Sequence, residues 1–289
     1  MPEGDTIYRT ARALNRALAG RRVVSFETGL AKLARVNDDT PLVGRMVEQV
    51  ESRGKWCLIH FSASSSGDEP LILVTHMFMS GSWHLYRTGE RWRMPKRAMR
   101  CVIRTDAYEA VAFNVPVAEF HTERSLTRST QVPNLGPDVL GDEFTAETGV
   151  ARLAAYAREH PEAEVGVVLL NQRVLAGLGN VYKSEVAFAA KVNPWRPVGT
   201  LTRAEITGLV DFALRYMRAN VANGKGDGIV TYTGQRRTTD RTNPNDRNWV
   251  YRRSGQECRR CGATILMRKQ GTQARSTYWC PECQKAVVS

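Results

Sequence analysis

The chain has 289 residues, enough for two domains, and its 42% hydrophobic content is enough to bury a core. Its 41 Lys and Arg against 29 Asp and Glu leave a formal net charge of +12. A polyanion is therefore the expected partner: nucleic acid, an anionic membrane or an acidic small molecule. No apolar run approaches the roughly 20 residues of a membrane-spanning helix, and the acidic start MPEGDTIYRT is unlike a secretory signal. We expect a cytoplasmic protein with no membrane partner.

The N-terminal part predicts one helix followed by many strands. Asp5 is the expected N-cap of a helix whose apolar face ends near Gly20. From about residue 22 to 120, short strand-like runs follow one another without intervening helices, which favours a sandwich or a barrel. These runs are Met46–Val50, Trp56–Phe61, Leu71–Thr75, Ser82–Tyr86, Cys101–Arg104 and Ala110–Phe113. The two cysteines of this part, Cys57 and Cys101, are expected to be buried thiols.

The C-terminal part changes to helical periodicity after a linker at residues 133–137. Four helices are predicted, over Thr145–His160, Val165–Gln172, Asn180–Lys191 and Thr202–Ala222. A polar stretch from Asn223 to Asn248 then resembles a mobile loop. The whole chain is thus predicted to be α+β.

Two CxxC pairs near the C-terminus predict a metal site. Cys258 and Cys261 are separated from Cys280 and Cys283 by 18 residues, which is within the spacing of a four-cysteine zinc site. Two disulfides or a redox pair are the alternatives, but the expected reducing cytosol favours one structural zinc ion. The segments between the pairs can form a hairpin with its turn near Gln270 and Gly271.

The charge of this segment indicates what the finger binds. Residues 252–289 contain eight basic and two acidic side chains, a net +6 that is half of the total for the chain. A small rigid hairpin with this charge suits a phosphate backbone. A cationic face that only keeps the protein soluble is the alternative.

A glycine-rich turn, AGLGN at residues 176–180, joins two of the predicted helices. Gly177 and Gly179 allow close backbone approach, and Asn180 is placed where it can cap the following helix, whose free N–H groups can bind phosphate. The turn lacks the GxGxxG order, and no parallel sheet precedes it, so a dinucleotide fold is not expected.

Three motifs together carry a family resemblance: Pro-Glu-Gly after the initiator Met, QRVLAGLGNVYKSE in the helical region, and RSTYWCPECQ in the finger. The chain resembles the formamidopyrimidine-DNA glycosylase and endonuclease VIII family over essentially its whole length. The resemblance implies an N-terminal catalytic β-sandwich domain with a leading helix over 1–130, a helix–two-turn–helix DNA-binding domain over 138–224, a mobile loop over 225–247 and a four-Cys zinc finger over 248–289. It also implies a bifunctional DNA glycosylase and AP lyase of base excision repair that acts on damaged DNA.

The resemblance assigns the chemistry to the N-terminus. After removal of Met1, Pro2 is the expected nucleophile and forms a Schiff base with the sugar, followed by β,δ-elimination. Glu3 is the expected general acid and base, and Lys55, in a predicted hairpin turn, contacts the phosphate near the lesion. No small-molecule cofactor is implied. A monomer is expected, because one chain carries every group.

The resemblance also assigns residues to DNA. Asn180 matches the phosphate-binding asparagine of the helical motif, and Arg275 matches the finger arginine that clamps the phosphate of the flipped nucleotide. His76 is expected near phosphate. Met79, with Phe78 as the second choice, is the expected wedge that fills the gap left by the flipped nucleotide.

The chain departs from the purine-repair branch of the family at several positions. Gly4 follows the catalytic glutamate as in the endonuclease VIII branch, Thr6 replaces a second glutamate that both branches share, and the Arg-Arg-Phe-Gly wedge is absent. These differences favour oxidised pyrimidines such as thymine glycol. Three alternatives stay open: a glycosylase specific for formamidopyrimidine or 8-oxoguanine, a non-catalytic binder of damaged DNA, and an RNA-binding zinc ribbon.

Overall fold

The computed structural model describes residues 2–65, 67–130, 132, 134–222, 238–239 and 247–285. The chain divides into a first unit of residues Met1–Asn134 with Gly224–Gly234, and a second unit of Leu135–Asn223 with Gln235–Ser289. The loop predicted over 225–247 lies outside the described residues, except for Thr238, Thr239 and Arg247. Among the residues that are described, no helix is both long and apolar enough to cross a membrane.

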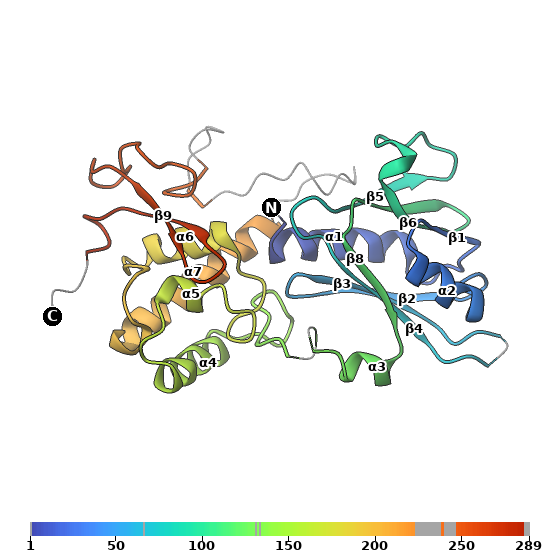
Figure 1. Ribbon diagram of the computed structural model, residues 1–289, viewed down its shortest axis with the longest axis horizontal. Helices are drawn as coiled ribbons and strands as arrows, with labels where there is room; N and C mark the ends of the chain where they lie inside the picture. The colour runs from blue at the N-terminus through green and yellow to red at the C-terminus, as the bar shows by residue number, and fades with distance from the viewer. Residues whose placement is uncertain are drawn as a thin grey trace. The chain divides into compact units, whose positions relative to one another are not determined.

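The first unit is a sandwich of two four-stranded antiparallel sheets, ordered β1-β6-β7-β5 and β2-β3-β4-β8, with helix α1 packed among them (Figure 1). The predicted α+β class and N-terminal β-sandwich are therefore confirmed. Its elements are α1 (Gly4–Leu18), β1 (Ser25–Thr28), α2 (Ala31–Asp39), β2 (Val47–Arg53), β3 (Trp56–Phe61), β4 (Leu71–His76), β5 (Ser82–Arg87), the 3-10 turn η1 (Lys96–Ala98), β6 (Met99–Arg104), β7 (Tyr108–Phe113), β8 (Val117–His121) and α3 (Glu123–Thr127).

Two sequence predictions for this unit are wrong. The N-cap of α1 is Glu3, and Asp5 lies inside the first helical turn. Helix α2 interrupts the strands, although no helix was expected there. Its sequence, AKLARVNDD, buries only Leu33, so the helix has little apolar periodicity to recognise.

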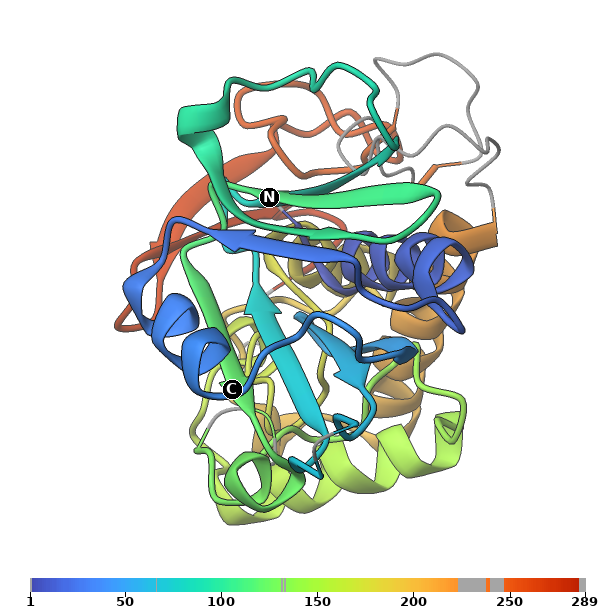
Figure 2. The same cartoon turned by 90° about the vertical axis from the view of Figure 1, so that its right-hand side faces the viewer.

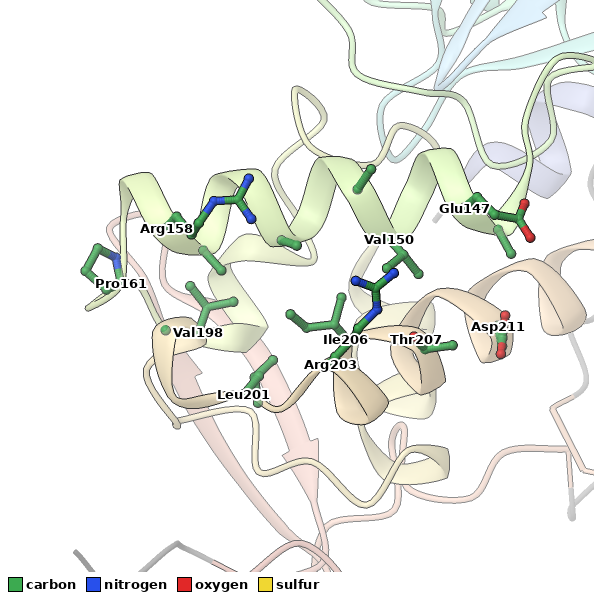
Figure 3. A pocket seen from close by; sticks show the side chains of 15 residues that line it. Glu147, Val150, Arg158, Pro161, Val198, Leu201, Arg203, Ile206, Thr207 and Asp211 are labelled. Carbon is green, nitrogen blue, oxygen red and sulfur yellow. The ribbon is translucent and has the colours of Figure 1, made fainter.

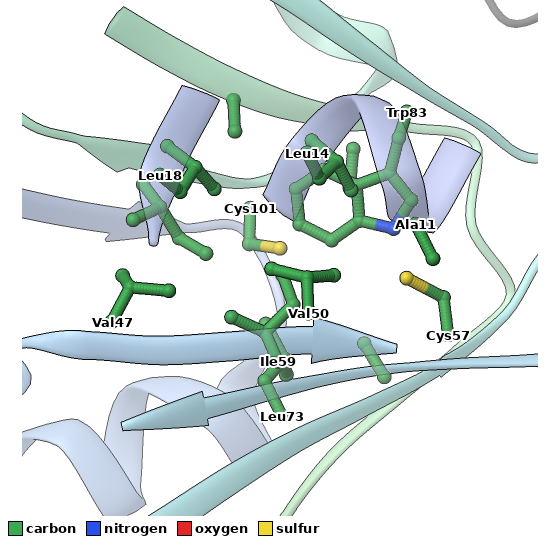
Figure 4. Packing of buried hydrophobic residues seen from close by; sticks show 14 of the residues in the cluster. Ala11, Leu14, Leu18, Val47, Val50, Cys57, Ile59, Leu73, Trp83 and Cys101 are labelled. Carbon is green, nitrogen blue, oxygen red and sulfur yellow. The ribbon is translucent and has the colours of Figure 1, made fainter. Parts of the chain in front are cut away.

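The apolar core of the first unit lies between its two sheets and α1. Leu14 and Leu18 of α1 pack with Ile59, Trp83 and Cys101 from both sheets, as Figure 4 shows. Cys57 and Cys101 are fully buried, which confirms the predicted buried thiols, and burial raises the pKa of each to about 12. The first unit therefore has a well-packed core.

A second apolar layer covers the outer face of the β1-β6-β7-β5 sheet. Tyr86, Val102, Val111 and Phe113 pack there against residues of the connection between β5 and β6. Both views show this connection, in teal, on the side of the sheet away from α1 (Figures 1 and 2).

The second unit is helical and ends in a two-stranded hairpin. Its elements are α4 (Ala146–Glu159), α5 (Val165–Val168), α6 (Asn180–Ala189), the 3-10 turn η2 (Val198–Thr200), α7 (Arg203–Ala222), β9 (Leu266–Gln270) and β10 (Arg275–Trp279). Thr145 begins α4 with a capping box, because its hydroxyl accepts from the Thr148 N–H and the Thr148 hydroxyl accepts in return. Every residue of α6 after Asn180 is buried, so α6 is the central helix of this unit.

Candidate functional site

Pro2 and Glu3 immediately precede α1. Glu3 is the N-cap residue, and its carbonyl accepts from the N–H groups of Thr6 and Ile7 at 2.9 and 3.1 Å. Its side chain makes no capping bond but is fully buried. The start of the helix therefore fixes the backbone of the residue that follows Pro2, and the Glu3 carboxyl lies in a site removed from bulk water.

Lys55 lies at the same end of the first unit as Pro2 and Glu3. The Val50 N–H donates to Asn15 Oδ1 at 2.7 Å, and the Gly20 N–H donates to the Val47 carbonyl, so α1 and β2 run antiparallel. From Asn15 back to its start, the helix covers about 18 Å. From Val50 the strand covers about 10 Å to the turn that holds Lys55. Pro2, Glu3 and Lys55 thus gather at one end of the sandwich.

His76 lies at this end because β4 ends there. It pairs with Trp56, the residue after Lys55, and the two rings are 4.7 Å apart. Its Nδ1 accepts from the Phe78 N–H at 3.0 Å, so the proton of the neutral ring is on Nε2. Burial, aided by the charge of Lys55, lowers the pKa of His76 to about 4. His76 is therefore a neutral hydrogen-bond donor at pH 7.

The loop after β4 presents two apolar side chains to solvent. Met77 is buried, whereas Phe78 and Met79 are 49% and 64% exposed. The loop is tight, because the Gly81 N–H donates to the Met77 carbonyl at 2.8 Å and a Cβ on Gly81 would lie 2.7 Å from that oxygen. We call the end of the first unit that carries Pro2, Glu3, Lys55, His76 and this loop the reactive end.

Asn180 and Arg275 are brought together in the second unit. Lys183 Nζ donates to Thr277 Oγ1 at 2.6 Å, and the Tyr278 N–H donates to Ser184 Oγ at 3.3 Å, so α6 and β10 run side by side in the same direction. Asn180 begins α6 and Arg275 begins β10. The two residues therefore lie at the same end of this packed pair, which we call the α6 end.

Asn180 is the first residue of α6 and is partly exposed. The N-cap is Gly179, so the predicted capping role of Asn180 is wrong. Its Oδ1 is buried, without a hydrogen-bond partner among the described residues. The Gln172 side chain closes the preceding turn by accepting from the Gly177 N–H and donating to the Leu178 carbonyl. Gly177 has φ of 101°, which explains the glycine.

Arg275 stands at the tip of the hairpin. Its Nε and Nη2 both donate to Gln273 Oε1 at 3.1 Å, so one neutral side chain holds the guanidinium in a two-pronged geometry. An anion with two acceptor oxygens can take the place of this amide.

The four finger cysteines form a metal-binding donor set. The ligand sulfurs of Cys258, Cys261, Cys280 and Cys283 all lie within 4.8 Å of one another. Backbone N–H groups of Arg260 and Cys283 point at the sulfurs of Cys258 and Cys280, at 3.4 and 3.5 Å. Four converging sulfurs with such support fit one structural zinc ion.

Buried polar residues that were not predicted from the sequence attach the finger to the helices. Glu185 accepts from the N–H groups of Trp249, Val250 and Tyr251 at 2.7, 2.9 and 2.7 Å, and also from the Thr238 hydroxyl. Burial raises the pKa of Glu185, although these hydrogen bonds act in the opposite direction. A charged residue in the apolar helix α6 was the available signal.

Two glutamines complete the attachment of the finger. Gln270 donates to Glu164 Oε2 and to the Pro194 carbonyl at 2.9 and 2.8 Å. Gln284 donates to the Val192 carbonyl at 2.8 Å and accepts from the Cys280 N–H at 3.0 Å. Both side chains are buried. The hairpin that carries Arg275 is thereby fixed to the helical part of the second unit.

A groove of about 850 Å³ also lies between α4 and α7 (Figure 3). Alanines of α4 line much of it, and Arg158, Arg203, Glu147 and Asp211 stand around it. None of the predicted site residues lines this groove, so it is separate from both ends described above.

Three parts of the chain match domains of known protein families. Residues 1–117 match the formamidopyrimidine-DNA glycosylase N-terminal domain, 135–232 the formamidopyrimidine-DNA glycosylase H2TH domain, and 255–286 the zinc finger found in FPG and IleRS.

Similar proteins cover nearly the whole chain. "Probable endonuclease 8 2" of Streptomyces coelicolor is 36% identical over 98% of this chain and 94% of its own. "DNA-(apurinic or apyrimidinic site) lyase Nei2" of Mycolicibacterium smegmatis is 33% identical over 99% and 100%. Lactococcus lactis Fpg in complex with abasic-site DNA shares the fold, with a TM-score of 0.77 and 21% identity over 98% and 100%.

Proposed function

Because this chain belongs to the formamidopyrimidine-DNA glycosylase and endonuclease VIII family, we propose that it is a bifunctional DNA glycosylase and AP lyase that acts through Pro2. The family places it among the DNA glycosylases and AP lyases of base excision repair. The proposal adds the residues, the order of the steps and the preferred damage. The observation that carries it is the gathering of Pro2, Glu3 and Lys55 at the reactive end.

The reaction begins with the amine of Pro2 once Met1 is removed. A terminal amine with a pKa near 8 is partly neutral at physiological pH. Its lone pair attacks C1′ of the damaged nucleotide, and the bond to the base breaks as the base takes a proton. The attached amine then loses its proton, and its lone pair forms the iminium as the C1′–O4′ bond breaks and the ring oxygen takes a proton. The iminium makes the C2′ proton acidic, so the 3′ phosphate leaves first and the 5′ phosphate leaves in a second elimination. Water finally releases Pro2.

Glu3 is placed to move the protons of this sequence. Its carboxyl is buried one residue from the nucleophile, on a backbone fixed by α1. Such a group can protonate the opening sugar and then accept a proton in a later step.

The neighbouring side chains hold the DNA. Lys55 supplies a positive charge for the phosphate beside the lesion, and neutral His76 offers its Nε2 proton to a phosphate oxygen. Met79, more exposed than Phe78, enters the base stack when the nucleotide is flipped out. At the α6 end, Asn180 and the guanidinium of Arg275 bind phosphate.

One zinc ion held by Cys258, Cys261, Cys280 and Cys283 would stabilise the finger and so position Arg275. We assign chemistry to residues 1–130 and DNA binding to residues 138–224 and 248–289. The protein is proposed to act as a monomer in the bacterial cytosol, because every residue named here lies on one chain and the similar proteins are bacterial.

Oxidised pyrimidines are the proposed substrates. Gly4 after Glu3 and the absence of the Arg-Arg-Phe-Gly wedge support this choice, as does the 36% identity to a protein named endonuclease 8. Single-lesion duplexes containing thymine glycol or 8-oxoguanine test it. Release of 8-oxoguanine without release of thymine glycol would contradict the pyrimidine preference.

Borohydride trapping on AP-site DNA tests the nucleophile. The wild-type protein, with Met1 shown by mass spectrometry to be absent, is expected to form a covalent complex. The substitution Pro2→Gly should lower its yield by a factor on the order of 100 or more. Lys32→Met removes another amine of the same unit and should leave the yield unchanged. Binding without trapping would favour a non-catalytic binder of damaged DNA.

A further inference from the structure

A second concentration of positive charge lies outside the finger, in the first unit. The connection from Arg87 to Arg100 has six basic residues and one acidic residue, Glu90. Its net charge of +5 is close to that of the finger, in less than half the length. We call residues 87–100 the basic connection.

The fold turns these charges outward. The neighbours of Trp92, Arg91 and Arg93, are exposed, whereas Trp92 itself packs inward. Its ring centroid is 5.7 Å from that of Phe113, and its Nε1 donates to Glu109 Oε2 at 2.9 Å. The Arg93 N–H donates to Tyr86 Oη at 3.0 Å. Met94 and Ala98 also pack inward on the outer layer of the sheet. The backbone of the basic connection is therefore anchored, which lowers the entropic cost of binding a ligand there.

The charges themselves are uncompensated within the part of the chain that the structure describes. The exposed cations are Arg87, Arg91, Arg93, Lys96 and Arg97. None of them forms an ion pair with another described residue, whereas Arg21, Arg104 and Arg196 all pair with carboxylates. Five like charges on one short segment repel each other, which destabilises the free protein and favours a polyanion as ligand.

The distance between the reactive end and the basic connection determines which part of a bound polyanion the basic connection would contact. Strand β5 begins one residue after Gly81, which closes the exposed Phe78–Met79 loop, and ends at Arg87. At about 3.3 Å per residue, it separates the loop from the basic connection by about 17 Å. Phosphates follow each other every ~3.4 Å along one strand of duplex DNA, so this distance corresponds to about five base pairs.

We propose that the basic connection binds the phosphate backbone of duplex DNA about five or more base pairs from the damaged nucleotide. This inference rests on the proposed function for the identity of the polyanion. The contact adds affinity for long duplexes without reading sequence, because cations that meet only phosphate carry no base information.

The test compares two duplexes with the same central abasic-site analogue, one with about four and one with about fifteen base pairs on each side. The variant is Arg91→Gln/Arg93→Gln/Arg97→Gln. Its affinity for the long duplex should fall about tenfold or more, and the slope of log K against log salt should shrink by about two to three. Its affinity for the short duplex should not change.

A charge-matched control is Arg35→Gln/Arg124→Gln/Arg128→Gln. All three arginines are exposed. Arg35 lies on α2, Arg124 lies on α3, and Arg128 is the C-cap of α3. Both helices contact β8, which belongs to the other sheet. This control should bind both duplexes as the wild type does. A second variant, Arg91→Lys/Arg93→Lys/Arg97→Lys, keeps the charge and should retain the affinity for the long duplex.

Three results would overturn the proposal: equal losses on both duplexes, equal losses in the two triple variants, or no loss in either. Trapping on the short AP-site duplex separates this proposal from the proposed function. The first triple variant should be trapped like the wild type, whereas failure of the wild type to be trapped would contradict the catalytic proposal alone.

Discussion

The reactive end and the α6 end hold their residues by different means. Pro2, Lys55 and Met79 stand on a helix start, a turn and a loop around an apolar core formed by two sheets and α1. Among the described residues, the finger shares a small apolar cluster with α6, which includes Phe188, Val250 and Ile265. Buried polar residues attach the finger to the helices, and four cysteines form its metal-binding donor set. The reactive end should therefore tolerate changes that the finger does not.

Loss of a zinc ligand should have the largest effect, and it should affect the finger and not the reactive end. Cys261→Ser should abolish zinc binding and weaken binding to abasic-site DNA by a factor on the order of 100, because metal binding supplies much of the folding free energy of a small finger. Metal analysis and fluorescence anisotropy would measure both effects.

The matched control for the ligand change is Cys101→Ala, which removes a buried thiol from the core of the first unit. It should lower the unfolding free energy by about 1 kcal/mol and leave zinc bound. If Cys261→Ser retained zinc and affinity, the finger would not depend on its metal.

The second largest effect is expected from a change of the buried Glu185 carboxylate. Glu185→Gln replaces an acceptor of three backbone N–H groups with an amide whose NH₂ cannot accept, so the unfolding free energy of the second unit should fall by about 2–4 kcal/mol. Denaturant unfolding followed by the fluorescence of Trp249 measures it.

The exposed Glu159 is the control for this change, and Glu159→Gln should alter the unfolding free energy by less than about 0.5 kcal/mol. Equal stability of the two variants would show that Glu185 does not secure the finger.

The effect that is smallest at pH 7 is the titration of His76 at the reactive end, since the ring is then mostly neutral in both the folded and the unfolded protein. The pKa of His76 is about 4 in the folded protein because of burial and Lys55, and its ordinary value is 6.5. Unfolding therefore takes up a proton between these values, and the unfolding free energy should fall as pH drops from 6.5 towards 4. NMR titration of the ring should give a midpoint near 4.

His76→Gln removes this titration and should make the unfolding free energy less dependent on pH across the same interval. Lys55→Met should raise the midpoint of His76 only part of the way, since burial is the larger cause. A midpoint near 6.5 in the wild type would contradict the buried, neutral ring.

Local signals in the sequence determined much of the molecule. A short strand-like run bounded by turn signals located Trp56–Phe61 with correct bounds, and the CxxC spacing located the four cysteines that the structure brings together. The motifs around Pro2, Asn180 and Arg275 identified the family. Each of these signals lies within a short stretch of chain, so it can be read without knowledge of distant contacts.

The tertiary structure alone decided which distant residues meet. The antiparallel packing of α1 on β2 brings Pro2 and Lys55 to one end, and the partner of Lys183 is 94 positions away, at Thr277. Glu185, Gln270 and Gln284 are polar residues that sequence alone would place on the surface. Their burial is stable only because backbone groups far along the chain satisfy them, and no local pattern records that pairing.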